Sequence, residues 1–298
     1  MIAGRRALGL AALLLAGMAG VQASPAQAKT DAISRGNKAF AEGDLRGALS
    51  LYEQAAAADT KAYEAVTLAG ETETRLEEPQ KAVAYYARAV AIDPNREAAY
   101  RLWGDALMKA ADMKGAEEKF VEAILAEPYV KAPRQGLKRW ADANHAHLSD
   151  PPIRLPARAT VDAQGQVRPA VDPGTAKRPA AEAWAAYAAA PAAWSGREFH
   201  QRYPAEKAYR DSLAEEMESL RGVLAAVAAM QKDGRLPDGQ LDPTLRSMQA
   251  LDKDGMLESC VLLDHWDPGI AQDYPGYRAE HKDTLRAYMY KYVIHPAR

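Results

Sequence analysis

The chain has 298 residues, of which 48% are hydrophobic and 26% are charged, and its formal net charge is −2. This composition is typical of a soluble globular protein, and the length accommodates two domains or a repeat array followed by one further domain. The small net charge and the lack of a run of basic residues argue against nucleic acid as a partner.

Residues 1–23 have the pattern of a secretory signal peptide. Arg5 and Arg6 are followed by an apolar run from Ala7 to Val21, and small residues precede Ser24. The run of about 15 residues is shorter than the ~20 residues that a membrane-spanning helix requires. We therefore predict a cleaved segment, with a retained anchor as the alternative. The mature protein would be exported to the periplasm of a Gram-negative bacterium or secreted, without an integral membrane segment.

Three consecutive blocks between residues 29 and 130 share one period. The glycines Gly36, Gly70 and Gly104 are 34 residues apart, since 70 − 36 = 34 and 104 − 70 = 34. The same step separates two columns of alanine, which are Ala48, Ala82 and Ala116, and Ala55, Ala89 and Ala123. It also separates the aromatic residues Tyr52, Tyr86 and Phe120. A last column holds Thr60, Pro94 and Pro128. A fixed period of this length indicates a repeat architecture.

A 34-residue period with this order of small residue, aromatic residue, small residue and proline resembles the tetratricopeptide repeat. The resemblance implies three pairs of antiparallel helices, over about 29–62, 63–96 and 97–130. A solenoid of this kind needs a capping helix at its end, with an apolar face toward the last repeat and a polar face toward the solvent. The stretch from Gln135 to His147, with Leu137 and Trp140 on one side, fits that capping role. The predicted array with its cap therefore covers 29–147.

By the same resemblance, the first helix of each repeat lines a concave groove. The implied groove residues are Asn37, Phe40, Thr67, Glu71, Arg75, Arg101, Asp105 and Lys109. Chaperone-binding members of the family hold a peptide C-terminus with a clamp of Lys, Asn and Arg. That clamp is absent, because its places hold Ile33 and Asn37, Thr67 and Glu71, and Arg101 and Asp105. The mixed charge predicts an internal segment or a folded surface of a partner protein, and the alternative is a solvated spacer.

Residues 148–180 differ from the array because they are rich in proline, which excludes regular helix. Apolar and polar residues alternate from Ile153 to Val161, a turn follows over 162–165, and a second alternating stretch begins at Val167. The region is predicted to be a linker or a short β-hairpin.

Residues 181–298 have the pattern of a helical C-terminal domain. The longest predicted helix runs from Ala205 to Gln231, with Glu215 and Glu216 on faces other than its apolar seam. Its apolar seam consists of Leu213, Met217, Leu220, Leu224 and Val227. We interpret the seam as packing within its own domain, and a homodimer seam is the alternative.

Candidate chemistry is sparse in this sequence. None of the short catalytic, phosphate-binding or dinucleotide-binding motifs is present, so no catalytic residue, cofactor or metal is predicted. The stretch Asp252 to Gly255 resembles part of a calcium loop, but Ala250 and Val261 stand where such a loop needs carboxylates. The single cysteine, Cys260, lies in an apolar run and is expected to be buried and inert. If an activity exists, Glu258, Asp264 and His265 are the first candidates.

These observations predict an all-α protein: a three-repeat solenoid with a capping helix, a proline-rich linker or short β-hairpin, and a C-terminal helical domain. The favoured function is a non-catalytic periplasmic adaptor or scaffold that binds an unidentified protein or peptide in the groove. One alternative is a structural assembly component that self-associates, for example as a homodimer. The other is a hydrolase of the cell envelope with its site in the C-terminal half.

Overall fold

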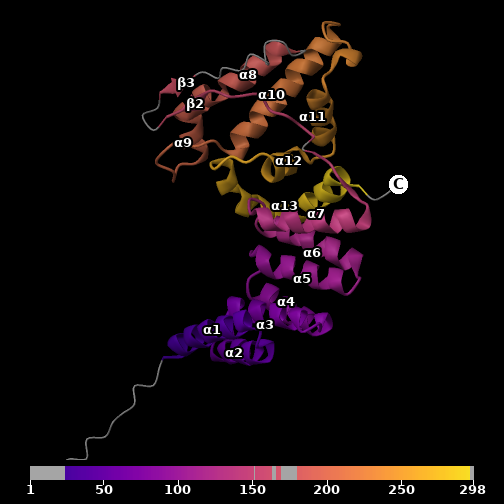
Figure 1. Cartoon of the computed structure of the whole chain (residues 1–298). Coiled ribbons are helices and arrows are strands. Elements are labelled where there is room, and N and C mark those ends of the chain that lie inside the picture. Colours follow the sequence, from indigo (N-terminus) through magenta and orange to yellow (C-terminus); the bar gives the residue numbers. More distant parts are fainter. Residues whose placement is uncertain (1–23, 151, 163–165, 169–179, 296–298) are drawn as a thin grey trace, which may run out of the picture.

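The computed structural model describes residues 24–150, 152–162, 166–168 and 180–295. Within these residues the protein is a curved stack of helices, and the C-terminal half forms a second helical body at one end of the stack (Figure 1). The predicted signal peptide, residues 1–23, lies outside the described residues.

The repeat array is formed by helices that alternate in direction along the stack. They are α1 (Pro25–Glu42), α2 (Leu45–Ala58), α3 (Tyr63–Arg75), α4 (Pro79–Ile92), α5 (Glu97–Lys109), α6 (Met113–Ala126) and α7 (Lys131–Asn144). Local chemistry sets several of the ends. The side chains of Asp44 and Asp112 accept hydrogen bonds from the first turns of α2 and α6, and Pro79 occupies the first turn of α4.

The column of glycines and the column of aromatic residues meet inside each of the three repeats. A Cβ atom on Gly36 would lie 2.6 Å from the Tyr52 ring, and one on Gly104 would lie 2.9 Å from the Phe120 ring. Both rings are fully buried. The glycines therefore permit the two helices of a repeat to approach closely around an aromatic ring, which explains why both columns recur with one period.

Two short antiparallel ladders interrupt the helices. In the proline-rich region, β2 (Thr160–Val161) pairs with β3 (Val167–Arg168), with Thr160 opposite Arg168. This ladder is the predicted short β-hairpin. A second ladder was not predicted: β1 (His147–Leu148), just after the cap helix, pairs with β4 (Ile294–His295) near the end of the chain.

The C-terminal half is helical, in agreement with the prediction. Its elements are α8 (Ala181–Ala193), the π-helical turn η2 (Trp194–Glu198), α9 (Phe199–Arg202), α10 (Leu213–Lys232), the 3₁₀ turn η3 (Asp238–Gln240), α11 (Pro243–Lys253), α12 (Leu257–Asp264), the 3₁₀ turn η4 (Ile270–Asp273), α13 (Tyr274–Tyr288) and the π-helical turn η5 (Met289–Val293).

The longest helix of this half starts later than the sequence pattern predicts. Helix α10 begins at Leu213 instead of Ala205, because the Ser212 side chain accepts a hydrogen bond from the Glu215 N–H and caps the helix. Arg210 anchors the preceding non-helical segment by pairing with Glu206 at 2.9 Å and Asp273 at 2.6 Å. The apolar seam of α10 does pack inside the chain: Met217, Leu220 and Val227 are buried.

One hydrophobic core joins the end of the array to the C-terminal half. Phe120 and Ile124 of α6, Trp140 of α7 and residues of α10 to α13 belong to a single cluster of buried side chains. Across this boundary the Tyr274 hydroxyl donates a hydrogen bond to the Leu125 carbonyl at 2.8 Å. The last repeat and the C-terminal half therefore pack as one unit.

Candidate functional site

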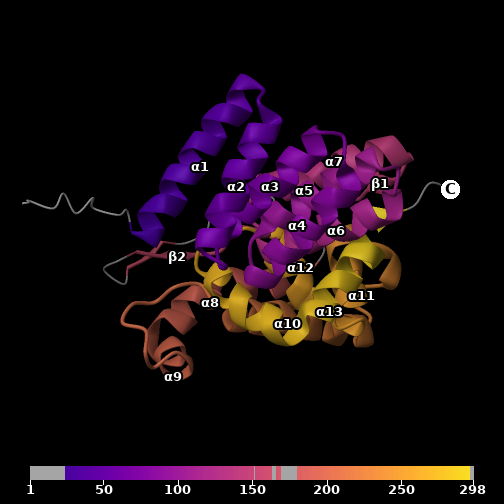
Figure 2. The ribbon, with the colours of Figure 1, turned by 90° about the horizontal axis from the view of Figure 1, so that it is seen from below.

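The predicted groove residues lie on the first helices of the repeats. Asn37 and Phe40 are on α1, Thr67, Glu71 and Arg75 are on α3, and Arg101, Asp105 and Lys109 are on α5. Seen along the stack, α1, α3, α5 and α7 form one side of the array, and α4 and α6 lie toward α10 and α13 (Figure 2).

One column of polar residues runs along this side with the period of the repeats. Asn37, Glu71 and Asp105 are 34 residues apart, and Arg139 of α7 continues the step, since 139 − 105 = 34. The Arg139 guanidinium pairs with the Asp105 carboxylate at 2.7 Å. Arg139 was not among the predicted groove residues, although extending the period by one repeat would have added it to this column.

The other predicted groove residues differ in how far their side chains are engaged within the chain. The Asn37 amide oxygen accepts a hydrogen bond from the Tyr52 hydroxyl at 2.8 Å. The Arg75 guanidinium lies 4.6 Å from the centre of the Phe40 ring, which is a cation–π distance. Arg101 pairs with Glu97 on its own helix at 2.9 Å.

Thr67 is buried, and its hydroxyl donates a hydrogen bond to the Tyr63 carbonyl at 2.8 Å, so it does not present its side chain to a ligand. Glu71 and Lys109, in contrast, have no ion-pair partner within the described part of the chain. Glu71 is half-buried and Lys109 is exposed. Arg75 is exposed and also has no ion pair there, so three predicted groove charges are available to a partner.

The C-terminal half packs away from this column. Helix α13 contacts α6, where Arg286 and Lys282 pair with Glu122 at 2.6 and 2.7 Å. Arg278 donates a hydrogen bond to the Pro94 carbonyl in the turn before α5. Among the described residues, no hydrogen bond or ion pair joins a helix from α8 to α13 to a predicted groove residue.

The 34-residue columns, the glycine–aromatic contacts and the alternating helices together decide the architecture of residues 24–144. The chain carries a tetratricopeptide-repeat (TPR) solenoid. No model of a protein family matches the chain, and no curated protein matches it.

Solved TPR structures resemble parts of the chain. The Sgt2 TPR domain from Aspergillus fumigatus is 26% identical, with 39% of this chain and 78% of that chain covered and a TM-score of 0.37. The Arabidopsis OM64 TPR domain is 22% identical over 40% of this chain and 98% of that chain, with a TM-score of 0.38. The MamA protein is 14% identical over 77% of this chain and 95% of that chain, with a TM-score of 0.36.

The structure brings together two of the three enzyme candidates of the C-terminal half, Asp264 and His265, and places Glu258 elsewhere. Glu258 pairs with Arg221 at 2.6 Å and lines a cleft of about 630 Å³. Asp264 and His265 line a different cavity of about 390 Å³. Asp264 pairs with Arg134 at 3.2 Å and accepts a hydrogen bond from the Tyr288 hydroxyl. Burial lowers the pKa of His265, although the charge of Asp264 opposes this shift.

The main charged cluster of this half was missed by the sequence pattern. Glu215 and Glu216, which lie outside the apolar seam of α10, are buried and both pair with Arg158 from the proline-rich region. The Tyr187 hydroxyl donates to Glu216 at 2.8 Å, and the Tyr209 hydroxyl donates to Glu215 at 3.0 Å. Helical periodicity could not reveal this burial, because a segment distant in sequence covers the first turn of α10.

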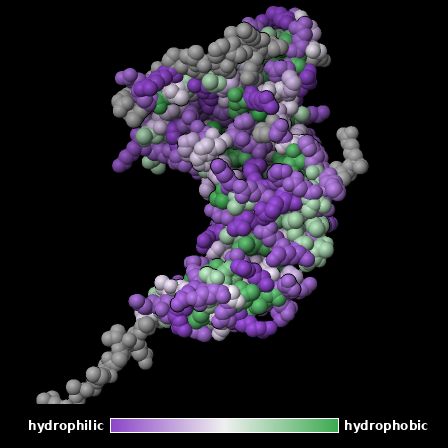
Figure 3. Space-filling model, in the orientation of Figure 1, coloured by the Kyte–Doolittle hydropathy of each residue, from purple (hydrophilic) through white to green (hydrophobic). Residues whose placement is uncertain are grey.

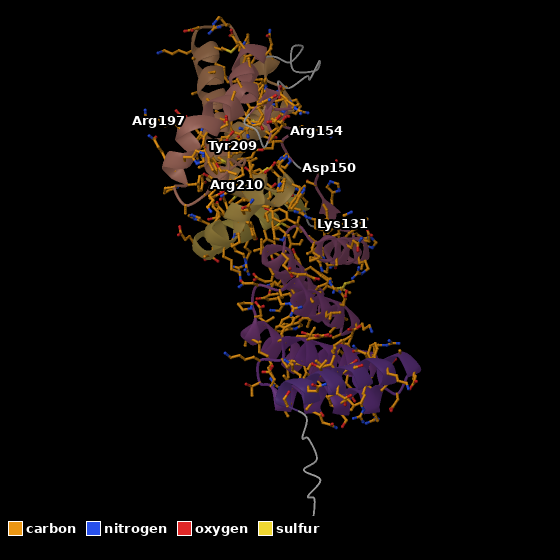
Figure 4. The ribbon with its side chains drawn as sticks, turned by 90° about the vertical axis from the view of Figure 1, so that its left-hand side faces the viewer. Lys131, Asp150, Arg154, Arg197, Tyr209 and Arg210 are labelled. Atoms are coloured by element: carbon orange, nitrogen blue, oxygen red, sulfur yellow. The ribbon has the colours of Figure 1, made fainter. Side chains whose placement is uncertain are left out.

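Burial is the largest cause of the altered ionisation in this cluster. It raises the pKa of Glu215 to about 7, with Asp211 and Glu216 adding to the rise and Arg158 and the Tyr209 hydroxyl opposing it. Tyr209 and Arg210 lie close together on the segment before α10 (Figure 4). Because the carboxylates are occupied by Arg158 and two tyrosines, the arrangement is that of a structural ion-pair network.

Metal and thiol chemistry find little support in the described part of the chain. No group of three or more His, Cys, Asp or Glu side chains there is arranged to hold a metal ion. Burial raises the pKa of the Cys260 thiol to about 12, which makes it a poor nucleophile. No helix of the described residues combines the length and the apolar character that crossing a bilayer requires.

Proposed function

We propose that the protein is a non-catalytic TPR adaptor that holds a segment or surface of a partner protein in the groove formed by α1, α3, α5 and α7. The observation that carries the proposal is the position of the C-terminal half. It packs on α6, and thus leaves the column of Asn37, Glu71, Asp105 and Arg139 accessible. A preformed groove of this kind binds with little ordering cost.

The charges of the groove favour a partner that carries both signs. Glu71 and Lys109 lack intramolecular ion pairs, and the lost clamp argues against a bare C-terminal carboxylate as the main anchor. An internal segment with basic and acidic side chains fits both groups. The signal-like pattern of residues 1–23 supports export, and the partner would then be a protein of the periplasm or the exterior.

The test is crosslinking of the tagged protein in cells, followed by identification of the captured partner. A Glu71→Lys, Lys109→Glu double variant should lose the partner, since it reverses two groove charges that lack ion pairs, without changing the net charge or breaking an internal ion pair. A Lys114→Glu, Glu118→Lys variant on α6 makes the matched change outside the groove and should retain the partner. Equal capture by both variants would place binding elsewhere.

The location of the protein needs a separate measurement. Cell fractionation and N-terminal sequencing of the purified protein should find it outside the cytoplasm, with a first residue near Ser24. A product that still starts at Met1 and stays in the cytoplasm would contradict export without bearing on the groove.

A further inference from the structure

The cavity of about 390 Å³ beside the end of α12 is lined by more carboxylates than cations. Its walls come from the proline-rich segment, from α10 and the segment before it, and from the connection between α12 and α13. Among the described lining residues, Arg158 is the only lysine or arginine. The acidic lining residues are Asp211, Glu216, Asp264 and Asp267, and the aromatic ones are Tyr187 and Trp266. This space is called the α12 cavity below.

Two of the four lining carboxylates are neutralised within the chain. Glu216 pairs with Arg158, and the same guanidinium also pairs with Glu215. Asp264 pairs with Arg134 at 3.2 Å. Because Arg158 already faces two glutamates, it has little positive charge to spare for the other two carboxylates of the lining.

The other two carboxylates, those of Asp211 and Asp267, have no ion pair in the described part of the chain. One oxygen of Asp267 accepts hydrogen bonds from the N–H groups of Gly269 at 2.7 Å and Ile270 at 2.9 Å, and no described residue donates to its second oxygen. Asp211 accepts from the Tyr209 hydroxyl at 3.1 Å, a donor that it shares with a glutamate of α10. Both aspartates therefore keep free acceptor oxygens and an unbalanced charge.

Asp211 and Asp267 lie on segments that touch. A Cβ atom on Gly269 would lie 2.5 Å from the Asp211 carbonyl oxygen and 3.1 Å from the Asp267 carboxylate, so the glycine permits this close approach. Burial raises the pKa of Asp211, and the charge of Asp267 adds to the rise, while Arg158 opposes it. The two carboxylates thus repel each other across this side of the α12 cavity.

Trp266 adds an exposed aromatic ring to the lining. It is 65% exposed, and its ring packs edge-on against Tyr129 with 4.7 Å between centroids. Burial raises the pKa of the Tyr129 hydroxyl to about 12, and the charges of Asp267 and Asp273 add to the rise. The potential at this aromatic pair is therefore negative. A tryptophan ring in such a place favours a cation, because the face of the ring also attracts positive charge.

One buried nitrogen atom of the lining has no partner. His265 Nε2 forms no hydrogen bond with the described residues. Burial lowers the pKa of His265, although Asp264 opposes this shift, so the imidazole is neutral and has one acceptor nitrogen. Buried polar atoms are nearly always hydrogen-bonded. In the tautomer that is protonated at Nδ1, a ligand with an N–H donor would satisfy Nε2.

The shape of the molecule leaves this region open to solvent. Figure 3 shows a hollow between the array and the C-terminal body, and the connection between α12 and α13, residues 265–273, lies on that side in Figure 1. Tyr209 and Arg210, the residues before Asp211, lie above Lys131, the first residue of α7 (Figure 4). A ligand that enters the hollow can therefore reach both aspartate-bearing segments.

We propose that the α12 cavity binds a primary ammonium group, with Asp211 and Asp267 as its anionic partners. His265 Nε2 accepts a further hydrogen bond, and the alkyl chain of the ligand packs on Trp266. An ammonium ion fits better than a guanidinium, because the free acceptors are single atoms on separate residues and an ammonium carries three donors around one point charge. A metal ion fits less well, since no group of three or more His, Cys, Asp or Glu within the described ranges is arranged to hold one.

The test is isothermal titration calorimetry on the full mature chain at neutral pH, with two amines and their uncharged counterparts. The amines are n-butylamine and the peptide acetyl-Gly-Lys-Gly-amide, and the counterparts are n-butanol and the same peptide with its lysine side chain acetylated. Each amine should bind at least about tenfold more tightly than its counterpart, and less tightly as salt rises. Tighter binding of the peptide than of n-butylamine assigns the site to a lysine of a partner protein, and otherwise to a small organic amine.

Variants of the lining locate the binding. Asp211→Asn, Asp267→Asn and Trp266→Ala should each weaken the binding of the amines by about tenfold or more. Asp267→Asn removes the charge but keeps an oxygen for the N–H groups of its turn, so circular dichroism should show an intact fold. Asp283→Asn is the matched control, because it removes an exposed carboxylate of α13 outside the lining, and it should leave binding unchanged.

Three results would overturn the proposal. The first is binding of n-butanol as tight as that of n-butylamine, since the cavity would then select an alkyl chain and not a charge. The second is unchanged binding by all three lining variants, which would place the amine elsewhere. The third is loss of binding in the Glu71→Lys, Lys109→Glu variant, which would assign the amine to the groove. None of these results bears on the capture of a partner protein, so the groove proposal is tested separately.

Discussion

Arg139 on the capping helix pairs with Asp105 on the last repeat at 2.7 Å. Arg139 lies one repeat length after Asp105 in the sequence. Helix α7 therefore occupies the position that the first helix of a fourth repeat would have. It lengthens the face formed by α1, α3 and α5 by one helix. Arg139 is about half exposed, so the pair is solvated on one side. Pairs of this kind orient side chains more than they stabilise a fold.

The stability of this pair can be measured with Asp105→Ala, Arg139→Ala and the double variant. The coupling free energy from urea unfolding should be small, about 0.2–1 kcal/mol, because water screens the charges. A coupling above about 2 kcal/mol would contradict the exposed geometry and would indicate a desolvated pair.

The close packing of glycine on aromatic rings predicts opposite effects for two Gly→Ala substitutions. At Gly104 the new Cβ would lie 2.9 Å from the Phe120 ring, so Gly104→Ala should destabilise the protein by about 1–3 kcal/mol through overpacking. At Gly222 in α10 no atom other than the adjoining backbone of its own helix and its two chain neighbours lies within 4 Å of the new Cβ. Gly222→Ala should therefore stabilise by up to ~1 kcal/mol, from helix propensity alone. Thermal unfolding of both variants should show melting temperatures displaced in opposite directions from wild type.

Arg158 is expected to be the most sensitive charged residue of the C-terminal half. Arg158→Met leaves Glu215 and Glu216 buried without their cation, which should cost about 3–5 kcal/mol of unfolding free energy. Arg168→Met, at an exposed arginine of β3, is the control and should change stability by less than ~0.5 kcal/mol. If uncompensated charge is the cause, adding Glu215→Gln and Glu216→Gln should recover part of the loss. No recovery would point to lost packing instead.

The raised pKa of Glu215 predicts a pH dependence of stability. Its pKa is about 7 in the folded protein against 4.5 for an ordinary glutamate, so the folded state binds more protons between these values. The unfolding free energy should therefore fall as pH rises from 4.5 to about 7, by on the order of 1–3 kcal/mol. Glu215→Gln removes this titration, and its stability should vary less over the same window in chemical denaturation. A wild type that gains stability over this window, with Glu215→Gln unchanged, would contradict the assignment.

The array was predictable because its packing is local and periodic. Gly70 and Tyr86, or Gly104 and Phe120, meet within one repeat, so their spacing in sequence reports their contact in space. The same period places the predicted groove residues on the first helices of the repeats, and their role in binding stays a prediction. The period does not show that Thr67 turns inward and donates a hydrogen bond to its own backbone. The 34-residue period, continued by one step, predicts that Arg139 follows Asp105 in this column, whereas the repeat motif ends before it.

The C-terminal half was less predictable, because its decisive contacts join distant segments. Glu215 and Glu216 belong to a helix pattern that places them outside, and only Arg158 and Tyr187, far away in sequence, make their burial tolerable. The exposure of Trp266 is a property of the tertiary arrangement too, since an aromatic residue next to the buried run of α12 would ordinarily be assigned to the core. Hydrophobic periodicity predicts that a segment is a helix. The segments that pack against this helix decide which of its faces are buried.

The ladder between β1 and β4 can form only late in biosynthesis, because its two strands lie far apart in the sequence. His147 follows the capping helix directly, but its partner His295 is made only after the whole C-terminal half. The cap, the shared core and this ladder can be completed only late, so the array passes through a period in which its last repeat is uncovered. We expect nascent chains that end before α13 to be sensitive to proteases at α6 and α7, with protection arising abruptly once Ile294 and His295 are present.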